Sequence, residues 1–273
     1  MGGCRRAASV RPRYATESAG EESADAEGAF HVSVPAGQVT TREGTDMKRI
    51  FAPTRGVEDW QRLLPEPEKQ WRDGYSAKEL AKRWEAAGGI PAEVAKLFHD
   101  SGVPAFGCID LLAAFPEWQT ELEGKGEASH SDVFIIARTR GELITITVEG
   151  KVCERFGPTV NEWLAEAHRG KDRNRRVRLQ FLGTTLGVAV EQVGDIRYQL
   201  LHRSAAAVIE ARRFGAPYAA MVVHSFGAKR KWFGDYEAFV ALYGARAGTG
   251  GLAKLRDIGG VQLYAGWATG TAP

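Results

Sequence analysis

The sequence predicts an α+β (α/β) fold in which helices flank a mixed central sheet. Three observations indicate this class. Residues 54–115 carry apolar positions at helical spacing. Residues 133–151 hold a continuous apolar run and then an alternating one, which is typical of two neighbouring strands. Beyond them, helical and strand patterns follow one another to about residue 268.

Residues 1–46 differ in composition from the rest of the chain. Their segment ATESAGEESADAEGA is small, polar and acidic, so it cannot bury enough apolar surface to offset its ordering entropy. Two interpretations stay open: a disordered tail, or a chain whose true start is Met47. We expect one globular domain over 47–273, with a helical N-terminal part at 54–115 and a core at 116–268.

The N-terminal part is predicted to be helical throughout. Ser76 followed by Glu79 is the pattern of a capping box, and Gly88 follows that helix. Pro91 stands in the first-turn position of the next helix. A further helix is predicted to end before Pro116. The helical segments are GVEDWQRLL, SAKELAKRWEAAG, PAEVAKLFHDSG and GCIDLLAAF.

The core pattern changes to strands. VFIIA (133–137) predicts a central strand buried on both faces, and LITITVEGKV predicts a neighbouring strand whose two faces differ. EWQTEL, just upstream, is compatible with an edge strand. The remaining predicted elements are the helices TVNEWLAEAHRG, DIRYQLLHRSAAAVIEARRFG and GDYEAFVALYG and the strands YAAMVVHSF and VQLYAGWA.

Composition limits the classes of function. The 36 Lys and Arg nearly balance the 34 Asp and Glu, so a surface for nucleic acid has to be local. No apolar run approaches the roughly 20 residues of a membrane helix, so we expect no membrane partner. The three cysteines are widely spaced and lack a CxxC pair, which fits a reducing cytoplasm and argues against a zinc knuckle.

Charged residues stand at the open end of the hairpin predicted at 131–151. Arg140-Gly141 is the natural turn, because glycine tolerates positive φ. This register places Asp132 directly opposite Glu149, about 5 Å apart at Cβ, with Lys151 on the same face. Like charges in that position are destabilising and need an offset. The cluster is either a surface salt bridge or a metal site.

Mg²⁺ is usually held by one or two carboxylates together with waters and phosphate oxygens. Asp132 and Glu149 are therefore the candidate metal ligands. The carbonyl of Gly150 is a third, because glycine lets a ligand approach the backbone closely.

Asp132 followed by Glu149-Gly150-Lys151 on the next strand, between flanking helices, resembles the PD-(D/E)XK nuclease superfamily. The resemblance implies a restriction-endonuclease-like core of helix, three strands, helix and strand. It also implies that Asp132 and Glu149 bind Mg²⁺ and that Lys151 orients water or stabilises the transition state. Ser131 stands where this motif often has proline. A polar group from a later helix is often added, and Gln199 and Arg203, with His202 beside them, are the candidates here.

Two longer stretches, VEGKV…FGPTV.EWL and RYQLLHR.A…IEA.RFGA, make the chain from residue 47 onward resemble a group of uncharacterised bacterial proteins. That likeness covers most of the chain and implies no activity.

The segment RGKDRNRRVR (169–178) holds six basic residues and one acid. It is either a phosphate-binding loop, through Arg173, Arg175 and Arg176, or a solvated connector.

The sequence thus predicts a cytoplasmic, Mg²⁺-dependent nuclease-like protein that hydrolyses phosphodiester bonds of nucleic acid, with Asp132, Glu149, Lys151 and Gln199 in the catalytic group. The alternative is a non-catalytic nucleic-acid-binding or interaction protein on the same fold.

Overall fold

The computed structural model describes residues 54–166, 172–227 and 231–271. The chain divides into two units, Met1–Thr45 and Asp46–Pro273. The prediction of a disordered tail over 1–46 lies outside the described residues.

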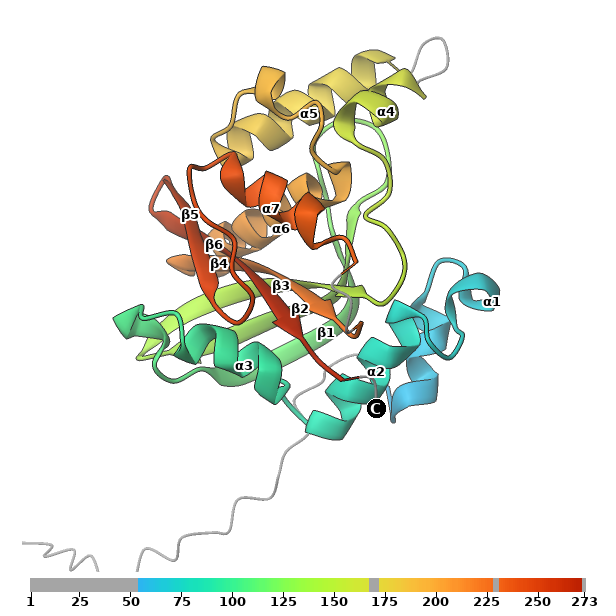
Figure 1. Cartoon of the computed structure of the whole chain (residues 1–273), viewed down its shortest axis with the longest axis vertical. Helices are drawn as coiled ribbons and strands as arrows, with labels where there is room; N and C mark the ends of the chain where they lie inside the picture. The colour runs from blue at the N-terminus through green and yellow to red at the C-terminus, as the bar shows by residue number, and fades with distance from the viewer. Residues whose placement is uncertain (1–53, 167–171, 228–230, 272–273) are drawn as a thin grey trace, which may run out of the picture. The chain divides into compact units, whose positions relative to one another are not determined.

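A six-stranded mixed sheet forms the centre of this unit (Figure 1). The first three strands form an antiparallel meander, β4 is parallel to both β3 and β6, and β5 pairs antiparallel with β6. The order across the sheet is β1-β2-β3-β4-β6-β5, so the predicted mixed sheet is confirmed. The strands are β1 (Asp110–Thr120), β2 (Ser129–Thr139), β3 (Glu142–Lys151), β4 (Tyr218–Ser225), β5 (Leu252–Ile258) and β6 (Val261–Thr269).

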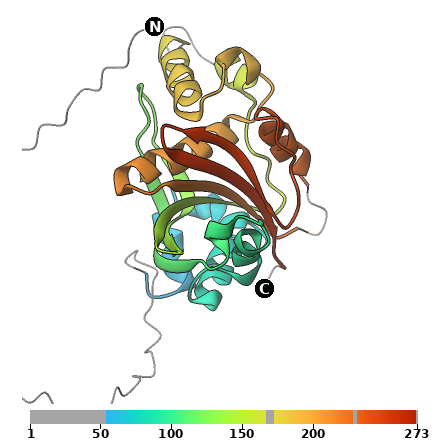
Figure 2. The same cartoon turned by 90° about the vertical axis from the view of Figure 1, so that its left-hand side faces the viewer.

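Helices cover both faces of the sheet, as Figures 1 and 2 show from two directions. The N-terminal helices pack on one face and the later ones on the other. The α-helices are α1 (Pro67–Gln70), α2 (Ser76–Ala87), α3 (Ala92–His99), α4 (Val160–Ala165), α5 (Asp172–Leu186), α6 (Tyr198–Phe214) and α7 (Phe233–Ala241). Three 3₁₀ helices accompany them: η1 (Val57–Leu63), η2 (Pro104–Phe106) and η3 (Val190–Gln192).

The two faces of β3 explain how the sheet is held. Ile144, Ile146 and Val148 belong to the core shared with α2 and α3, as the alternation predicts. On the other face, the hydroxyls of Thr145 and Thr147 donate to main-chain carbonyls of α6 at 2.9 and 3.0 Å. The polar face of β3 is therefore buried against a helix, with its hydroxyls hydrogen-bonded.

The β2–β3 hairpin has the predicted register. Val133 pairs with Val148 and Thr139 with Glu142, and the turn is Arg140-Gly141. Both turn residues have positive φ, 43° and 95°, which is the geometry of a tight two-residue hairpin loop. The position of Asp132 relative to Glu149 follows from this register.

Three local predictions were wrong. GCIDLLAAF is not a helix, because residues 110–120 form the edge strand β1, where Pro116 is tolerated. The basic segment is not a loop in its described part, because α5 begins at Asp172. The capping box at Ser76 is absent: Ser76 is the first helical residue, and no side chain of its own turn caps α2.

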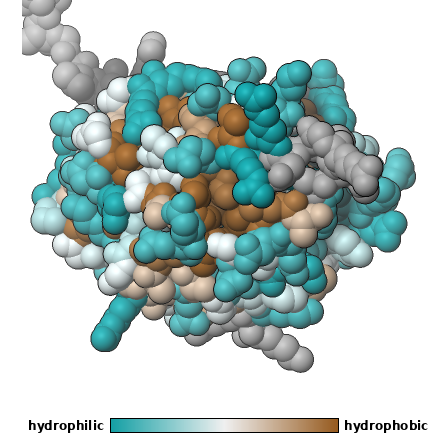
Figure 3. Space-filling view, turned by 90° about the horizontal axis from the view of Figure 1, so that it is seen from above, coloured by the Kyte–Doolittle hydropathy of each residue, from teal (hydrophilic) through white to brown (hydrophobic). Residues whose placement is uncertain are grey.

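Seen from above, the surface carries a central area of hydrophobic residues surrounded by hydrophilic ones (Figure 3). Val177 of α5 is one of the large apolar residues that stay exposed. Within the described residues, no helix has the length and apolar character needed to cross a bilayer.

Candidate functional site

Three carboxylates occupy one row across three neighbouring strands. The β2–β3 register, continued one step beyond Val133–Val148, places Asp132 opposite Glu149. On the other side of β2, the pairs of Pro116 with Val133 and Trp118 with Ser131 leave Glu117 opposite Asp132. The row therefore runs Glu117, Asp132, Glu149 at the same end of the meander.

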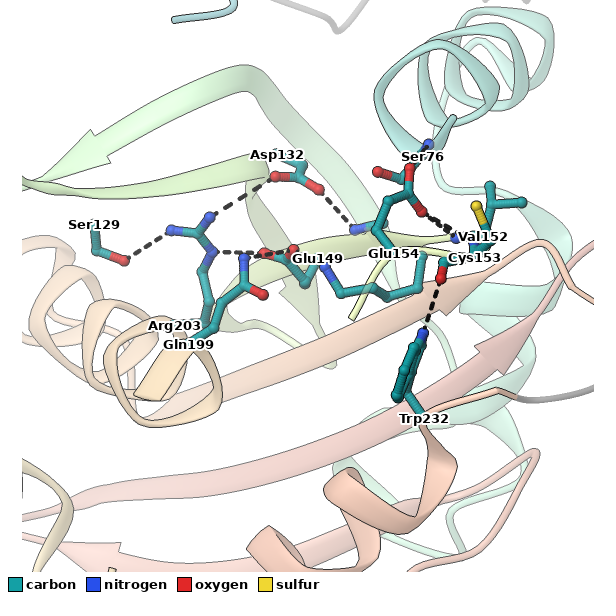
Figure 4. A network of polar contacts seen from close by, with 12 residues as sticks. Ser76, Ser129, Asp132, Glu149, Val152, Cys153, Glu154, Gln199, Arg203 and Trp232 are labelled. Carbon is teal, nitrogen blue, oxygen red and sulfur yellow. Dashed lines mark hydrogen bonds and ion pairs between the residues drawn. The ribbon is translucent and has the colours of Figure 1, made fainter. Parts of the chain in front are cut away.

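The β2–β3 ladder opens at this row. The N–H of Gly150 donates to Asp132 Oδ2 at 2.8 Å (Figure 4). A Cβ added to Gly150 would lie 3.3 Å from that same oxygen and 3.4 Å from Cβ of Ser76 in α2. A larger residue would crowd this position, because Asp132 and α2 both approach the main chain here.

Glu149 is held on both carboxylate oxygens. Oε1 lies 2.5 Å from Lys151 Nζ and accepts from Gln199 Nε2 at 2.8 Å, and Oε2 accepts from Arg203 Nε at 2.7 Å (Figure 4). Gln199 and Arg203 come from adjacent turns of α6, as expected of the later helix. Arg203 also reaches toward Asp132, with 3.9 Å between its terminal nitrogen and Oδ1.

The electrostatics separate the three acids. Burial favours the neutral form of Glu149, but Lys151 and Arg203 outweigh it and hold the pKa of Glu149 below its usual value. Burial, with the charge of Glu149, raises the pKa of Asp132 to about 7. Burial and the charge of Asp132 raise the pKa of Glu117 well above its usual range. Two cations, Lys151 and Arg203, thus face three carboxylates. Glu149 is the carboxylate whose charge they stabilise, and Asp132 and Glu117 are the two with raised pKa values.

The row forms part of the wall of a cavity of about 1320 Å³. Other walls come from the loop between β1 and β2, the first turn of α2, the segment that follows β3, and helices α4, α5 and α6. The charged residues of the lining are Lys69, Glu117, Lys125, Glu127, Asp132, Glu149, Lys151, Glu154, Arg155, Arg175, Arg178 and Arg203. The predicted catalytic group, Asp132, Glu149, Lys151 and Gln199, is therefore brought together on one open space.

The three arginines predicted to bind nucleic acid all lie on α5, but only one of them lines the cavity. Arg175 lines the cavity, with its guanidinium carbon 5.1 Å from the ring centre of Trp163. Arg173 and Arg176 are exposed and are not part of the lining. Arg178 is buried and donates to three carbonyls of the β1–β2 loop, so its role is to hold that loop.

Two further polar residues have structural roles. Glu154, an extra acid near the site, accepts from the N–H of Ser76 at 2.8 Å and from those of Val152 and Cys153. It caps α2 from a distant part of the chain. His202 is half-buried; desolvation and the nearby charge of Arg203 lower its pKa well below the usual value, and its Nδ1 lies 2.8 Å from Ser129 Oγ.

Sequence reasoning missed Glu117. Reading GCIDLLAAF as a helix placed this residue beyond a helix end and outside any sheet register. The available signal was Pro116-Glu117 itself, because proline fits an edge strand and the next residue then faces Asp132. Glu117 has φ 50°, an uncommon value for a residue with a side chain.

Oxygen ligands for a cation are present, but a finished metal centre is not. Among residues 54–166, 172–227 and 231–271, no three His, Cys, Asp or Glu side chains form a group that could hold a metal ion. Asp132 and Glu117 nevertheless supply oxygen donors and surplus negative charge, which is the donor type that Mg²⁺ prefers.

Fold and cavity together define an α+β protein with a charged cavity at one end of a mixed sheet. A family model matches residues 53–272, and the chain belongs to that family, described as Domain of unknown function (DUF6946). The expected likeness to uncharacterised proteins is thereby confirmed. No curated protein and no solved structure matches the chain.

Proposed function

We propose that this protein is a Mg²⁺-dependent nuclease-like enzyme that hydrolyses phosphodiester bonds, with a core of the PD-(D/E)XK type. The single observation that carries the proposal is the row of three carboxylates, short by one cation, beside Lys151 in a cavity. The order of elements supports it: a helix, the meander β1–β3, helix α6 and strand β4, with α4 and α5 inserted before α6.

Asp132 and Glu149 would hold the metal, with the carbonyl of Gly150 as a candidate third ligand and Glu117 as an added oxygen donor. At this place Mg²⁺ would supply Lewis-acid chemistry for the hydrolysis of a phosphodiester. The raised pKa of Asp132 means that a cation and a proton compete for this carboxylate. Metal binding is therefore expected to strengthen as pH rises through about 7.

The chain's other groups position the row and offset charge. Lys151 Nζ is fixed between Glu149 and the ring of Phe156, whose centre is 4.9 Å away. From there it can stabilise negative charge that develops at phosphorus. Gln199 and Arg203 fix the carboxylate of Glu149, so they act as positioning residues.

One observation favours the non-catalytic alternative. Both oxygens of Glu149 already accept hydrogen bonds from Lys151, Gln199 and Arg203, so this carboxylate is satisfied without a metal. On the same fold, the cavity would then bind nucleic acid without cleaving it.

Metal-dependent cleavage is the direct test. Labelled single- and double-stranded DNA and RNA are incubated with the protein in Mg²⁺ or Mn²⁺, and with EDTA. We expect cleavage that EDTA abolishes and that falls by at least a hundredfold, about 3 kcal/mol of transition-state stabilisation, in Asp132→Asn and in Lys151→Met.

Asp132→Asn is the preferred variant because its carboxylate adds little to stability, whereas Glu149 anchors two buried cations. Calorimetry of Mg²⁺ binding to the wild type and Asp132→Asn supplies the matched control. If the protein bound nucleic acid but cleaved none of the substrates, the alternative function would be favoured. If it neither bound Mg²⁺ nor cleaved any substrate, the proposal of an enzyme would be wrong.

A further inference from the structure

The reacting groups of the proposed enzyme lie deep in the cavity. The side chains of Glu149 and Lys151 are 3% and 6% exposed, and that of Asp132 is 18% exposed. A phosphodiester has to enter the cavity to reach them. Enzymes whose target atom must enter a pocket act on single strands or extrude a nucleotide from the duplex. The depth of the row therefore favours a single strand over a duplex as the substrate.

The size of the cavity agrees with a polymer. Its volume of about 1320 Å³ exceeds the roughly 300–1,000 Å³ typical of pockets for small ligands. It is also bounded by several separate segments of chain, from Tyr75 at the start of α2 to Trp163 in α4. Such a space can hold consecutive nucleotides of one strand.

The charged residues of the lining differ in exposure. The carboxylates of the row and their partners Lys151 and Arg203 are near the bottom, whereas Lys125 of the β1–β2 loop and Arg155 after β3 are exposed. Glu127 also lines the cavity and is exposed, so the outer part has both signs with basic residues in excess. Lys and Arg contacts to phosphates dominate the affinity of proteins for nucleic acid.

Arg175 connects this outer part to an aromatic stack. The rings of Trp163 and Tyr198 are parallel within 11° with centroids 4.0 Å apart, and Arg175 lies over Trp163. One terminal nitrogen of Arg175 is buried without a hydrogen-bond partner among the described residues. A phosphate oxygen that reached this nitrogen would give it the acceptor that the described residues do not supply.

We propose that the cavity takes a single strand of nucleic acid, whose phosphates are held by Lys125, Arg155 and Arg175 while Arg173 and Arg176 take no part. This inference rests on the proposed function for the identity of the polymer. It adds the strandedness of the substrate and the residues that guide it. DNA and RNA share the phosphate and base chemistry used here, and the experiment separates them.

The test measures binding in EDTA, where no cleavage interferes. The probes are a fluorescent single-stranded DNA of about 12 nucleotides, the RNA of the same sequence, and the corresponding DNA duplex. Fluorescence anisotropy gives the dissociation constant of each. We expect one or both single strands to bind at least tenfold more tightly than the duplex.

Single substitutions then identify the basic residues that contact the bound strand. Lys125→Ala, Arg155→Ala and Arg175→Ala are each expected to weaken single-strand binding about fivefold to tenfold. Each should also reduce the slope of log affinity against log salt by about 0.7, the value for one lost phosphate contact on a single strand. Arg173→Ala and Arg176→Ala are the matched controls, since they remove exposed arginines from the same helix. Thermal denaturation confirms that every variant is folded.

Three results would overturn the inference: duplex binding as tight as single-strand binding, equal losses in the control variants, or no binding of any probe. Its failure is distinguishable from that of the proposed function. Mg²⁺-dependent cleavage of a duplex would refute the single-strand inference and keep the enzyme. Single-strand binding through Lys125, Arg155 and Arg175, with no cleavage in Mg²⁺, would keep the inference and refute the enzyme.

Discussion

Two clusters of partly buried charge pack against the sheet, and they differ in whether their charges are matched. On the face of α2 and α3, Glu93 accepts two bonds from Arg83, at 2.7 and 2.6 Å, and a contact from His224 at 3.0 Å. Burial opposes ionisation of Glu93, but these partners hold its pKa far below the usual value. One carboxylate meets one permanent cation.

The Glu93 cluster is covered on one side. A Cβ added at Gly270 would lie 2.7 Å from Glu93 Oε1 and 3.0 Å from His224 Nε2, so the chain after β6 packs against it, while the side chain of Arg83 stays 32% exposed. The row at Glu117, Asp132 and Glu149 has three acids for two cations and faces a cavity. The difference teaches that matched charge serves the fold, whereas unmatched charge that lines a cavity is what a ligand can use.

The largest expected effect tests the matched cluster. Glu93→Gln should lower the free energy of unfolding by about 2 kcal/mol, because it takes a charged acceptor from Arg83 and from a fully buried His224; the figure is discounted because Arg83 is 32% exposed. Urea denaturation at neutral pH measures it. A loss below about 1 kcal/mol would mean that the cluster is solvated and that the comparison fails on this side.

Asp132→Asn should raise the free energy of unfolding, which is the opposite of the effect expected for Glu93→Gln. Asp132 is raised to a pKa of about 7 in the folded protein, so near pH 5.5 the folded state binds a proton that the unfolded state has released. Wild-type stability from this group is present below about pH 4 and is lost as pH rises to about 7. The variant does not lose it, so it should become more stable than wild type by about 2 kcal/mol above pH 7.

The measurement is urea denaturation in EDTA at a series of pH values from 4 to 8. The figure is discounted because Asp132 interacts with Glu117 and Glu149, which take up part of the change. A difference between variant and wild type that stayed constant with pH would show that Asp132 is not the group with surplus charge. Glu117→Gln is expected to leave the wild-type profile in place, because burial and the charge of Glu149 raise the pKa of Asp132.

The smallest effect concerns a carboxylate that is matched by backbone donors alone. Glu154→Gln should cost about 1 kcal/mol of stability, the usual value of a helix cap with its charge. Its pKa is lowered by those hydrogen bonds despite burial, so the loss should disappear at low pH. Chemical denaturation at pH 7 and pH 3 checks both statements.

The features that the sequence predicted depend on short-range patterns, namely a turn, strand alternation and helical spacing. The β2–β3 register followed from one turn and strict alternation, and it placed Asp132, Glu149 and Lys151 together. The single-turn spacing of Gln199 and Arg203 likewise followed from helical geometry.

What could not be predicted depended on distant partners. Residues 111–115 are rich in Leu and Ala, which favour helices, and only pairing with β2 makes them a strand. Ser76 has a plausible local cap in Glu79, but Glu154, 78 residues away, takes that position. Arg173, Arg175 and Arg176 have the same chemistry, and only the packing of α5 turns one of them toward the cavity.

The Glu154–Ser76 contact gives the cavity a built-in reporter. The main-chain amide of Ser76 begins α2, lines the cavity, and is hydrogen-bonded to a carboxylate three residues after Lys151. Its nitrogen chemical shift and its rate of exchange with deuterium therefore depend on how the end of β3 is arranged. A single resonance can then follow occupancy of the cavity by metal or strand, without a label on either.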